Sequence, residues 1–149
     1  FLDYKDSSLE YNRELLNKLI GIIRQYKPEI IFSFDPANRK FDSPNLYHPD
    51  HRILAQVVFD ACFLAKNKYI HTGEPHRIEK IYFFGTDQPN YYEDITDLID
   101  FKLELLACYS SQFPDFTKVA DFIKNDLSKR IAQYEYSEAF RILEIKQLT

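Results

Sequence analysis

The chain has 149 residues, of which 45% are hydrophobic and 28% charged, and its net charge is −4. This length suits one domain with a core of its own, and we expect a single domain over residues 1–149. The charges are spread along the chain without a basic block, which argues against nucleic-acid binding. No apolar run approaches the roughly 18 to 20 residues that a membrane span needs. The three glycines are too few for a phosphate-binding glycine loop.

The cysteines and the first residues bear on the cellular context. Cys62 and Cys108 lack metal-type spacing and lie in apolar or helical stretches. We therefore expect two buried, reduced thiols and a cytoplasmic location. The sequence contains no methionine and shows no signal peptide. We expect that residue 1 is not the natural start and that part of a larger domain lies upstream.

The first third of the chain predicts a helix, a strand and a loop. Residues 9–25 carry apolar side chains at the i, i+3, i+4 spacing of one helix face, and Pro28 prevents this helix from continuing. Residues 29–34 form a short apolar run that predicts a strand buried on both faces. Turn-forming residues 35–38 end the strand, and a polar loop over residues 39–47 follows.

The remaining chain alternates helices and strands. We expect helices over residues 49–66, 98–109, 116–134 and 137–145, and strands over residues 80–84 and 93–96. Strands separated by helices predict an α/β fold with a parallel sheet. Ligands of such sheets bind beyond the carboxyl ends of the strands, and the loop after Phe34 leads to that edge.

The tetrapeptide His48-Pro49-Asp50-His51 places two imidazoles and a carboxylate at a predicted helix start. Proline is favoured at the first helical position, which makes His48 the expected N-cap. The helix dipole favours Asp50 and keeps a nearby imidazole neutral, as a metal ligand must be. One histidine could bind a metal while the other donates a proton, with Asp50 orienting an imidazole. A capping turn with solvent-exposed histidines explains the same residues equally well.

The order of these features resembles the LmbE-like, or PIG-L, family of zinc-dependent de-N-acetylases over nearly the whole chain. The residues that carry the resemblance are Phe1 to Leu9 with Asp6, Pro28 to Pro36, the tetrapeptide, Arg52, Asp60-Ala61, Asp94-Ile95-Thr96, Lys102, Ser111-Gln112 and Tyr136-Ser137-Glu138-Ala139-Phe140-Arg141. The combination is more specific than the tetrapeptide alone. One family position often held by histidine is Tyr109 here.

The resemblance implies a Rossmann-like three-layer α/β sandwich with a mostly parallel sheet. It implies hydrolysis of the acetamide of an N-acetylglucosamine-type amino-sugar conjugate, a small-molecule substrate, with Zn2+ or another divalent metal as the cofactor. By the same resemblance, His51 is a metal ligand and His48 is the proton donor or oxyanion stabiliser. Asp50 is then the supporting carboxylate of His48, and Asp6 contacts the sugar.

The chain departs from the family in one respect. The family's other motif, His-Pro-Asp-Asp-Glu, supplies two zinc ligands and the general base, and it is absent from this sequence. A catalytic zinc uses three protein ligands, so we expect this chain alone to bind zinc weakly and to lack deacetylase activity. We also expect the sheet to lack its N-terminal strand and to expose an apolar edge.

Two other functions stay open. A non-catalytic carbohydrate-binding or structural remnant of the same fold would carry the same residues. A metal phosphohydrolase using Asp50 and His51 predicts further His and Asp pairs on helices, which the sequence lacks. The 11 tyrosines and 13 phenylalanines suggest a buried self-interface, and hence a homo-oligomer.

Overall fold

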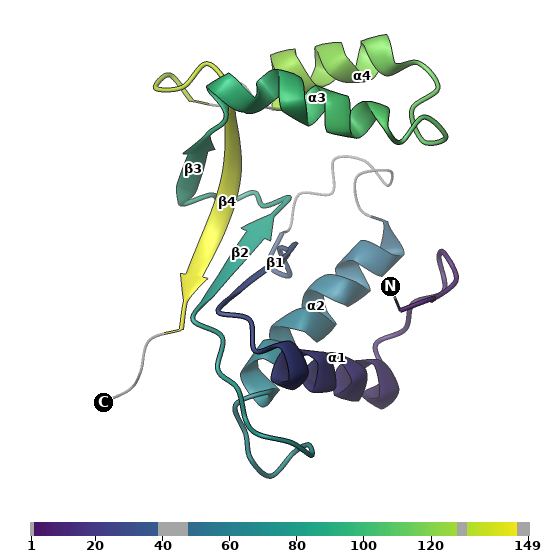
Figure 1. The fold of residues 1–149 in the computed structure, drawn as a ribbon, viewed down its shortest axis with the longest axis vertical. Coiled ribbons are helices and arrows are strands. Elements are labelled where there is room, and N and C mark those ends of the chain that lie inside the picture. The colour runs from purple at the N-terminus through teal and green to yellow at the C-terminus, as the bar shows by residue number, and fades with distance from the viewer. Residues whose placement is uncertain (1, 39–47, 128–130, 146–149) are drawn as a thin grey trace. The chain divides into compact units, whose positions relative to one another are not determined.

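Helices and strands alternate along the first part of the chain. The structure, a computed structural model, describes residues 2–38, 48–127 and 131–145. Its elements are α1 (Arg13–Tyr26), β1 (Ile30–Phe34), α2 (Pro49–Leu64), β2 (Lys80–Phe84), β3 (Tyr91–Asp94), the 3-10 turn η2 (Thr96–Leu98), α3 (Ile99–Ala107), α4 (Phe116–Phe122), the π-helical turn η3 (Ile123–Leu127) and β4 (Ser137–Glu144) (Figure 1). The loop predicted over residues 39–47 lies outside the described residues.

The chain divides into two compact units. The first comprises Phe1–Pro89 with Arg141–Thr149, and the second comprises Asn90–Phe140. β4 crosses the boundary, so its two halves are paired within different units. The single domain expected over residues 1–149 stays a prediction.

The four described strands form a mixed sheet in the order β1-β2-β4-β3. β1 and β2 are parallel, with Ile31 opposite Ile81, whereas β4 runs antiparallel to both β2 and β3. The predicted α/β fold is therefore confirmed. The predicted mostly parallel arrangement is seen only in the β1–β2 pair.

The helix predicted over residues 137–145 is wrong, because Ser137–Glu144 forms β4. Alanine, leucine and glutamate in this stretch favour a helix. As a strand, however, the segment gains backbone hydrogen bonds from β2 along one half and from β3 along the other. It also buries Ser137 and Phe140. Tertiary pairing outweighs local propensity here.

The boundaries of α1 are set by identifiable caps. The side chain of Asn12 accepts a hydrogen bond from the backbone N–H of Leu15 at 2.9 Å, so the helix begins at Arg13 rather than near residue 9. The helix ends at Tyr26. Its C-cap is Lys27, which has a left-handed φ of 49° and whose N–H donates to the carbonyl of Ile23. Pro28 follows immediately, as the sequence predicted.

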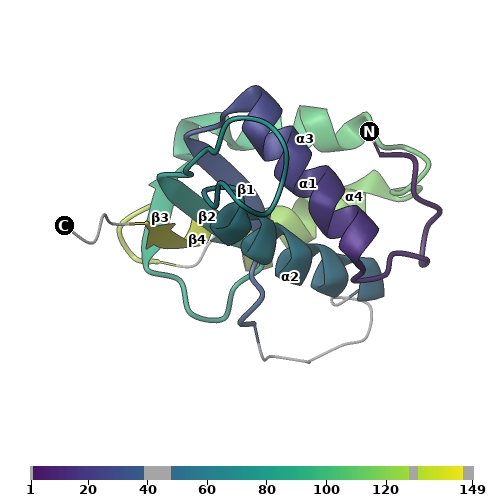
Figure 2. The same ribbon diagram turned by 90° about the horizontal axis from the view of Figure 1, so that it is seen from below.

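The first unit is built around one apolar core. α1 and α2 pack side by side (Figures 1 and 2), and the loop after α2 and strand β2 complete the core. Its most buried members are Leu15, Ile20, Val57, Ala61, Ile78, Ile81 and Phe83. The prediction that the first strand is buried on both faces is wrong, since Ile30 is 44% and Phe32 60% exposed. The helices of this unit cover one face, on which Ser33 is buried.

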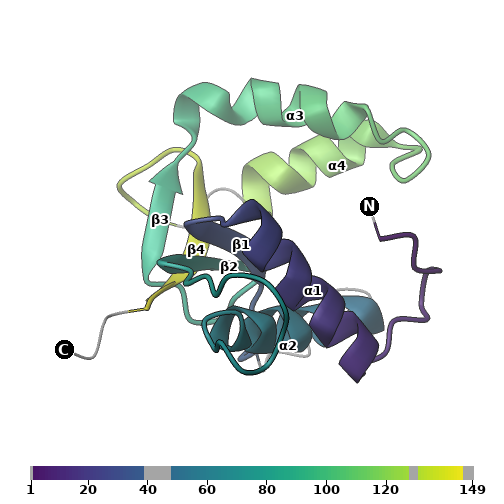
Figure 3. The same cartoon turned by 60° about the horizontal axis from the view of Figure 1, so that its bottom comes forward.

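The second unit pairs α3 with α4 next to the paired strands β3 and β4 (Figure 3). Its small core contains Ile95, Ile99 and Ile123. The helix predicted over residues 116–134 is shorter than expected, because α4 passes into a π-helical turn and residues 131–136 are not helical. The carbonyl of Tyr136 accepts a hydrogen bond from the N–H of Ile95, which ties the backbone just before β4 to the residue that follows β3.

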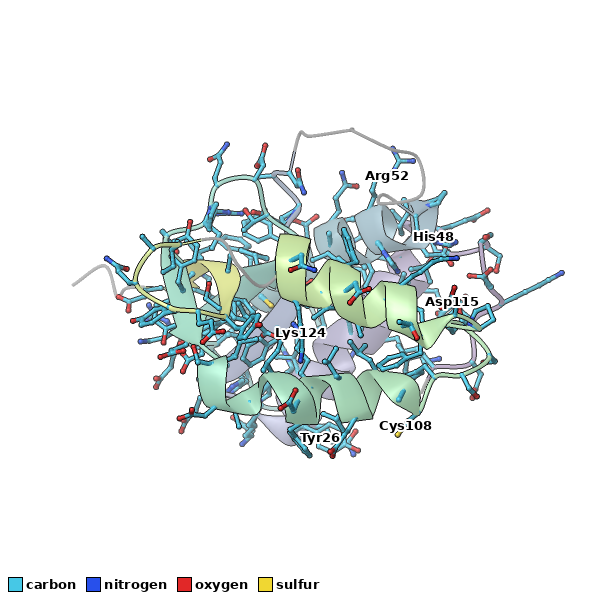
Figure 4. The ribbon with its side chains drawn as sticks, turned by 90° about the horizontal axis from the view of Figure 1, so that it is seen from above. Tyr26, His48, Arg52, Cys108, Asp115 and Lys124 are labelled. Carbon is cyan, nitrogen blue, oxygen red and sulfur yellow. The ribbon has the colours of Figure 1, made fainter. Side chains whose placement is uncertain are left out.

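The surroundings of the two cysteines correct one further prediction. Cys62 is buried as expected, but Cys108 is exposed at the end of α3 (Figure 4). Burial raises the pKa of the Cys62 thiol to about 12. In the same view Lys124 lies against α3, where its Nζ is 3.1 Å from Asp100.

The fold brings the carboxyl ends of β1 and β2 together. β1 ends at Phe34 and β2 at Phe84, and the N–H of Asp35 donates to the carbonyl of Phe84 at 3.1 Å. This is the edge at which ligands of parallel sheets bind. Within the described part of the chain, no helix has the length and apolar character that crossing a membrane requires.

Candidate functional site

The start of α2 is built as the sequence predicted. His48 is the N-cap, Pro49 is the first helical residue, and the side chain of His48 accepts a hydrogen bond from the N–H of Asp50 at 3.3 Å. The accepting atom is Nδ1, so a neutral ring carries its proton at Nε2. The helix cap thereby fixes the tautomer of His48. His48 and Arg52 both belong to this end of α2 (Figure 4).

Asp50 fastens the N-terminal segment to α2. Its Oδ2 accepts a hydrogen bond from the N–H of Ser7 at 2.8 Å, and its Oδ1 accepts one from the N–H of Leu9 at 3.1 Å. Hydrogen bonds to an ionised carboxylate are stronger than neutral ones, and the helix N-terminus favours this charge. Asp50 therefore holds residues 6–9 beside His48, from which they are distant in sequence.

Asp6, His48 and Asp50 form the described group that could hold a metal ion, with one ligand atom from each lying within 4.8 Å of the others. The Oδ1 atom of Asp6 lies 3.5 Å from Nε2 of His48, and Oδ2 of Asp50 lies 4.0 Å from Nδ1. The side chain of Asp6 is 88% exposed and that of His48 is 33% exposed. The group is thus open to a solute.

The tautomer of His48, with its proton at Nε2, argues against the use of this ring as a metal ligand. A neutral imidazole has one ring nitrogen with a lone pair, and in His48 this nitrogen accepts the cap hydrogen bond from Asp50. Nε2 then carries hydrogen and is a donor. Binding a metal at Nε2 would require the cap bond to break. The spacing of the group fits a metal, but its donor chemistry fits a proton donor at His48.

The same tautomer excludes a serine nucleophile activated by this histidine. The hydroxyl of Ser7 lies 3.2 Å from Nε2 of His48, which resembles a Ser–His pair. A general base needs a lone pair at the nitrogen that faces the serine. Because Nε2 carries the proton, His48 donates to Ser7 instead of accepting from it.

His51, the last residue of the tetrapeptide, contacts the end of β1. Its ring stacks on Phe34 at the end of β1, with 4.1 Å between ring centroids and 15° between planes, and its centroid is 5.3 Å from that of His48. The residue remains exposed overall, yet desolvation of the ring and the nearby His48 lower its pKa, against the opposing charges of Asp50 and Asp6. A neutral ring with a free lone pair is what a metal requires. The role of His51 as a ligand stays a prediction.

A buried ion pair stands at the same edge of the sheet. Arg141 of β4 donates to Asp35 from Nε at 2.7 Å and from Nη2 at 2.5 Å, and the side chain of Asp35 is 1% exposed. Thr86 donates to the same carboxylate at 2.6 Å, and the N–H of Ala37 at 2.8 Å. Burial alone would raise the pKa of Asp35, but these hydrogen bonds outweigh it and hold the pKa below its ordinary value.

Sequence reasoning missed most of this second cluster. It assigned Asp35 to the turn, and the bond from Ala37 confirms that part. It did not pair Asp35 with Arg141, because these residues are far apart in sequence and Arg141 was expected on a helix. A strand prediction for residues 137–144 alone would not have placed Arg141 at this edge, because its position depends on the pairing of β4 with β2.

The sequence of this chain matches a family model and a curated relative. The family model "PIG-L: GlcNAc-PI de-N-acetylase" matches residues 1–62. The diacetylchitobiose deacetylase of Thermococcus kodakarensis is 32% identical in an alignment over 120 positions that covers 76% of this chain and 43% of the relative. The chain therefore spans less than half the length of this curated relative.

Solved structures agree with that relationship. The N,N'-diacetylchitobiose deacetylase of Pyrococcus horikoshii, solved with an inhibitor, matches with a TM-score of 0.79 and 27% identity, over 96% of this chain and 56% of that one. A conserved protein of Thermus thermophilus matches with a TM-score of 0.75 and 25% identity, over 99% and 66%. The 4-carboxy-2-hydroxymuconate hydratase GalB of Pseudomonas putida has a TM-score of 0.61 and 20% identity, over 95% and 62%. The last match concerns the fold alone.

Proposed function

Because the chain is homologous to the de-N-acetylases of the PIG-L, or LmbE-like, family, we propose that it forms part of a metal-dependent hydrolase. The reaction is removal of the acetyl group from an N-acetylglucosamine-type amino-sugar conjugate. The observation that carries the proposal is the cap of α2, which presents the Nε2–H of His48 beside Asp6. We further propose a Rossmann-like three-layer domain and a cytoplasmic location.

The donor chemistry assigns different tasks to the two histidines. His48 supplies a hydrogen at Nε2, suited to donation toward a developing oxyanion or a leaving amine. His51 has the lowered pKa and stands outside the cap, which suits a zinc ligand. When bound, zinc would polarise the amide carbonyl and lower the pKa of a water molecule.

The two aspartates have separate roles in this proposal. Both oxygens of Asp50 accept backbone hydrogen bonds, so Asp50 holds the N-terminal segment and the start of α2 in register. It supports His48 through the backbone N–H that the ring accepts from. Asp6 is exposed and accepts hydrogen bonds readily, and we assign it the hydroxyl groups of the sugar.

Acetate release tests the proposal. The substrates are N,N'-diacetylchitobiose and other N-acetylglucosamine conjugates, and the samples are this chain and the product of the complete reading frame, each with and without a chelator. We expect the complete product to release acetate, the chelator to abolish release, and this chain alone to be inactive. Failure of the zinc-loaded complete product to release acetate, with sugar binding retained, would favour the non-catalytic carbohydrate-binding alternative.

A further inference from the structure

Ser7 occupies a backbone conformation that serine rarely adopts. Its φ is 60°, in the left-handed region that favours glycine. This conformation turns the N–H of Ser7 toward Oδ2 of Asp50. Strain of this kind persists where the surroundings hold it, and here the hydrogen bond to Asp50 does so.

The hydroxyl of Ser7 joins the two polar side chains of the proposed site. It lies 3.2 Å from Nε2 of His48 and 3.4 Å from Oδ2 of Asp6. Since the cap bond places the ring proton at Nε2, the ring donates to the hydroxyl, and the hydroxyl donates to the carboxylate. The directions of both hydrogen bonds are therefore determined by the start of α2.

We propose that Ser7 is a positioning residue, whose hydroxyl holds Nε2–H of His48 and the carboxylate of Asp6 in one orientation. This inference rests on the proposed function for its purpose, since these are the groups assigned to proton donation and sugar binding. It adds a residue that neither the tetrapeptide nor the ligand count identifies.

Two substitutions remove the hydroxyl with opposite consequences for the backbone. Ser7→Gly relieves the left-handed strain, and Ser7→Ala retains it. Both keep the backbone N–H that binds Asp50. A hydroxyl effect must therefore appear in both variants, whereas a strain effect must differ between them.

The readout is the nitrogen-15 and proton NMR spectrum of the His48 ring in this chain. In the unaltered protein we expect the Nε2–H tautomer, with a ring N–H signal protected from exchange with water. Both variants should keep the tautomer and lose the protected signal, while the Leu9 amide signal stays in place and shows that Asp50 still holds the segment. Unchanged His48 signals in Ser7→Gly, or loss of the signal in Ser7→Ala alone, would overturn the proposal.

Kinetics separate this inference from the proposed function. In the complete, zinc-loaded protein, Ser7→Gly should lower kcat, because His48 loses its orientation, and raise KM, because Asp6 loses its orientation toward the sugar. If the complete protein releases no acetate while both variants lose the His48 signal, the proposed function fails and the role of Ser7 stands. If acetate is released and the signal is unchanged in Ser7→Gly, the role of Ser7 fails alone.

Discussion

At the scale of single residues, the two histidines of the tetrapeptide differ in what surrounds each ring. His48 is tied to the helix backbone through Nδ1, and His51 is held by the ring of Phe34. A helix N-terminus by itself would treat the two alike. The difference comes from β1, whose last residue lies under one imidazole.

The Phe34 ring should therefore control the protonation of His51. Phe34→Leu removes the stacked ring and admits water, so we expect the pKa of His51 to rise toward its ordinary value of about 6.5. The measurement is an NMR titration of the His51 ring, with Phe32→Leu, an exposed residue of the same strand, as the control. A lower pKa in Phe34→Leu would contradict the stacking argument.

The sign of the stability effect follows from that shift. Because the pKa of His51 is lower in the folded protein, the unfolded chain binds more protons between the folded pKa and about 6.5. Stability from this group is therefore present above that window and falls as the pH decreases through it. Because Phe34→Leu should raise the folded pKa of His51, the variant should narrow the pH range over which stability falls.

We expect the ion pair of Asp35 and Arg141 to stabilise the folded protein. Arg141→Met leaves the buried Asp35 carboxylate without its main partner, and we expect a loss of about 3–5 kcal/mol in the free energy of unfolding. Lys80→Met, which breaks an exposed pair with Glu144, is the matched control and should change stability little. Urea denaturation of the two variants measures the difference.

The same ion pair should make the stability of the protein depend on pH in acid. The folded pKa of Asp35 lies below its unfolded value, so its contribution to stability is present above the unfolded pKa of about 3.9 and is lost as the pH falls through the folded pKa. Arg141→Met should lose this acid dependence. An unchanged acid transition in that variant would show that Asp35 is not the group that titrates.

At the scale of elements, a side chain of α1 holds the loop that follows α2 in place through hydrogen bonds. The buried guanidinium of Arg24 donates to backbone carbonyls. Among the described residues its partners are the carbonyls of Ala65, Asn67, His71, Thr72 and Gly73, at 2.6–3.3 Å. Lysine cannot reproduce this planar fork. The residue thus closes the loop over the end of the helix pair.

Arg24→Lys should loosen this loop and destabilise the first unit. We expect a loss of more than about 2 kcal/mol, because Arg24 is buried and lysine would leave several of the carbonyls that it binds without their donors. Hydrogen exchange of the loop amides and denaturation measure the two effects. Lys27→Met, at the exposed end of the same helix, serves as the control, and equal stability of the two variants would refute this role of Arg24.

The elements also show what the sequence can predict. Local signals sufficed for α1, α2 and β2, because caps, Pro28, Pro49 and apolar periodicity act within a few residues. They failed for β4, whose hydrogen-bond partners lie far away in the sequence. The same limit applies to the site: the cap at His48 was predictable, but the bonds from Ser7 and Leu9 to Asp50 and the Asp35–Arg141 pair depend on tertiary contacts.

At the scale of the whole molecule, the ligand supply for a metal is limited. His48 has its lone pair committed to the cap, and both oxygens of Asp50 hold the backbone N–H groups of Ser7 and Leu9, so a metal drawing on Asp50 would compete with these bonds. Asp6 accepts from the Ser7 hydroxyl and is assigned to the sugar in the proposed function. Among the described side chains at this end of α2, His51 is then the ligand left for a metal, and even with Asp6 added the set falls short of the three that a catalytic zinc uses.

Zinc titration of the isolated chain should consequently show weak binding, with a dissociation constant well above the nanomolar range of complete zinc sites. His51→Gln should weaken the residual binding further. His48→Asn, which keeps a good N-cap side chain while removing the imidazole, should leave it unchanged. Calorimetry of the three proteins decides between the two donor sets, because loss of zinc binding in His48→Asn alone would make the Asp6–His48–Asp50 group the metal site. Tight stoichiometric binding by the unaltered chain would contradict the ligand count itself.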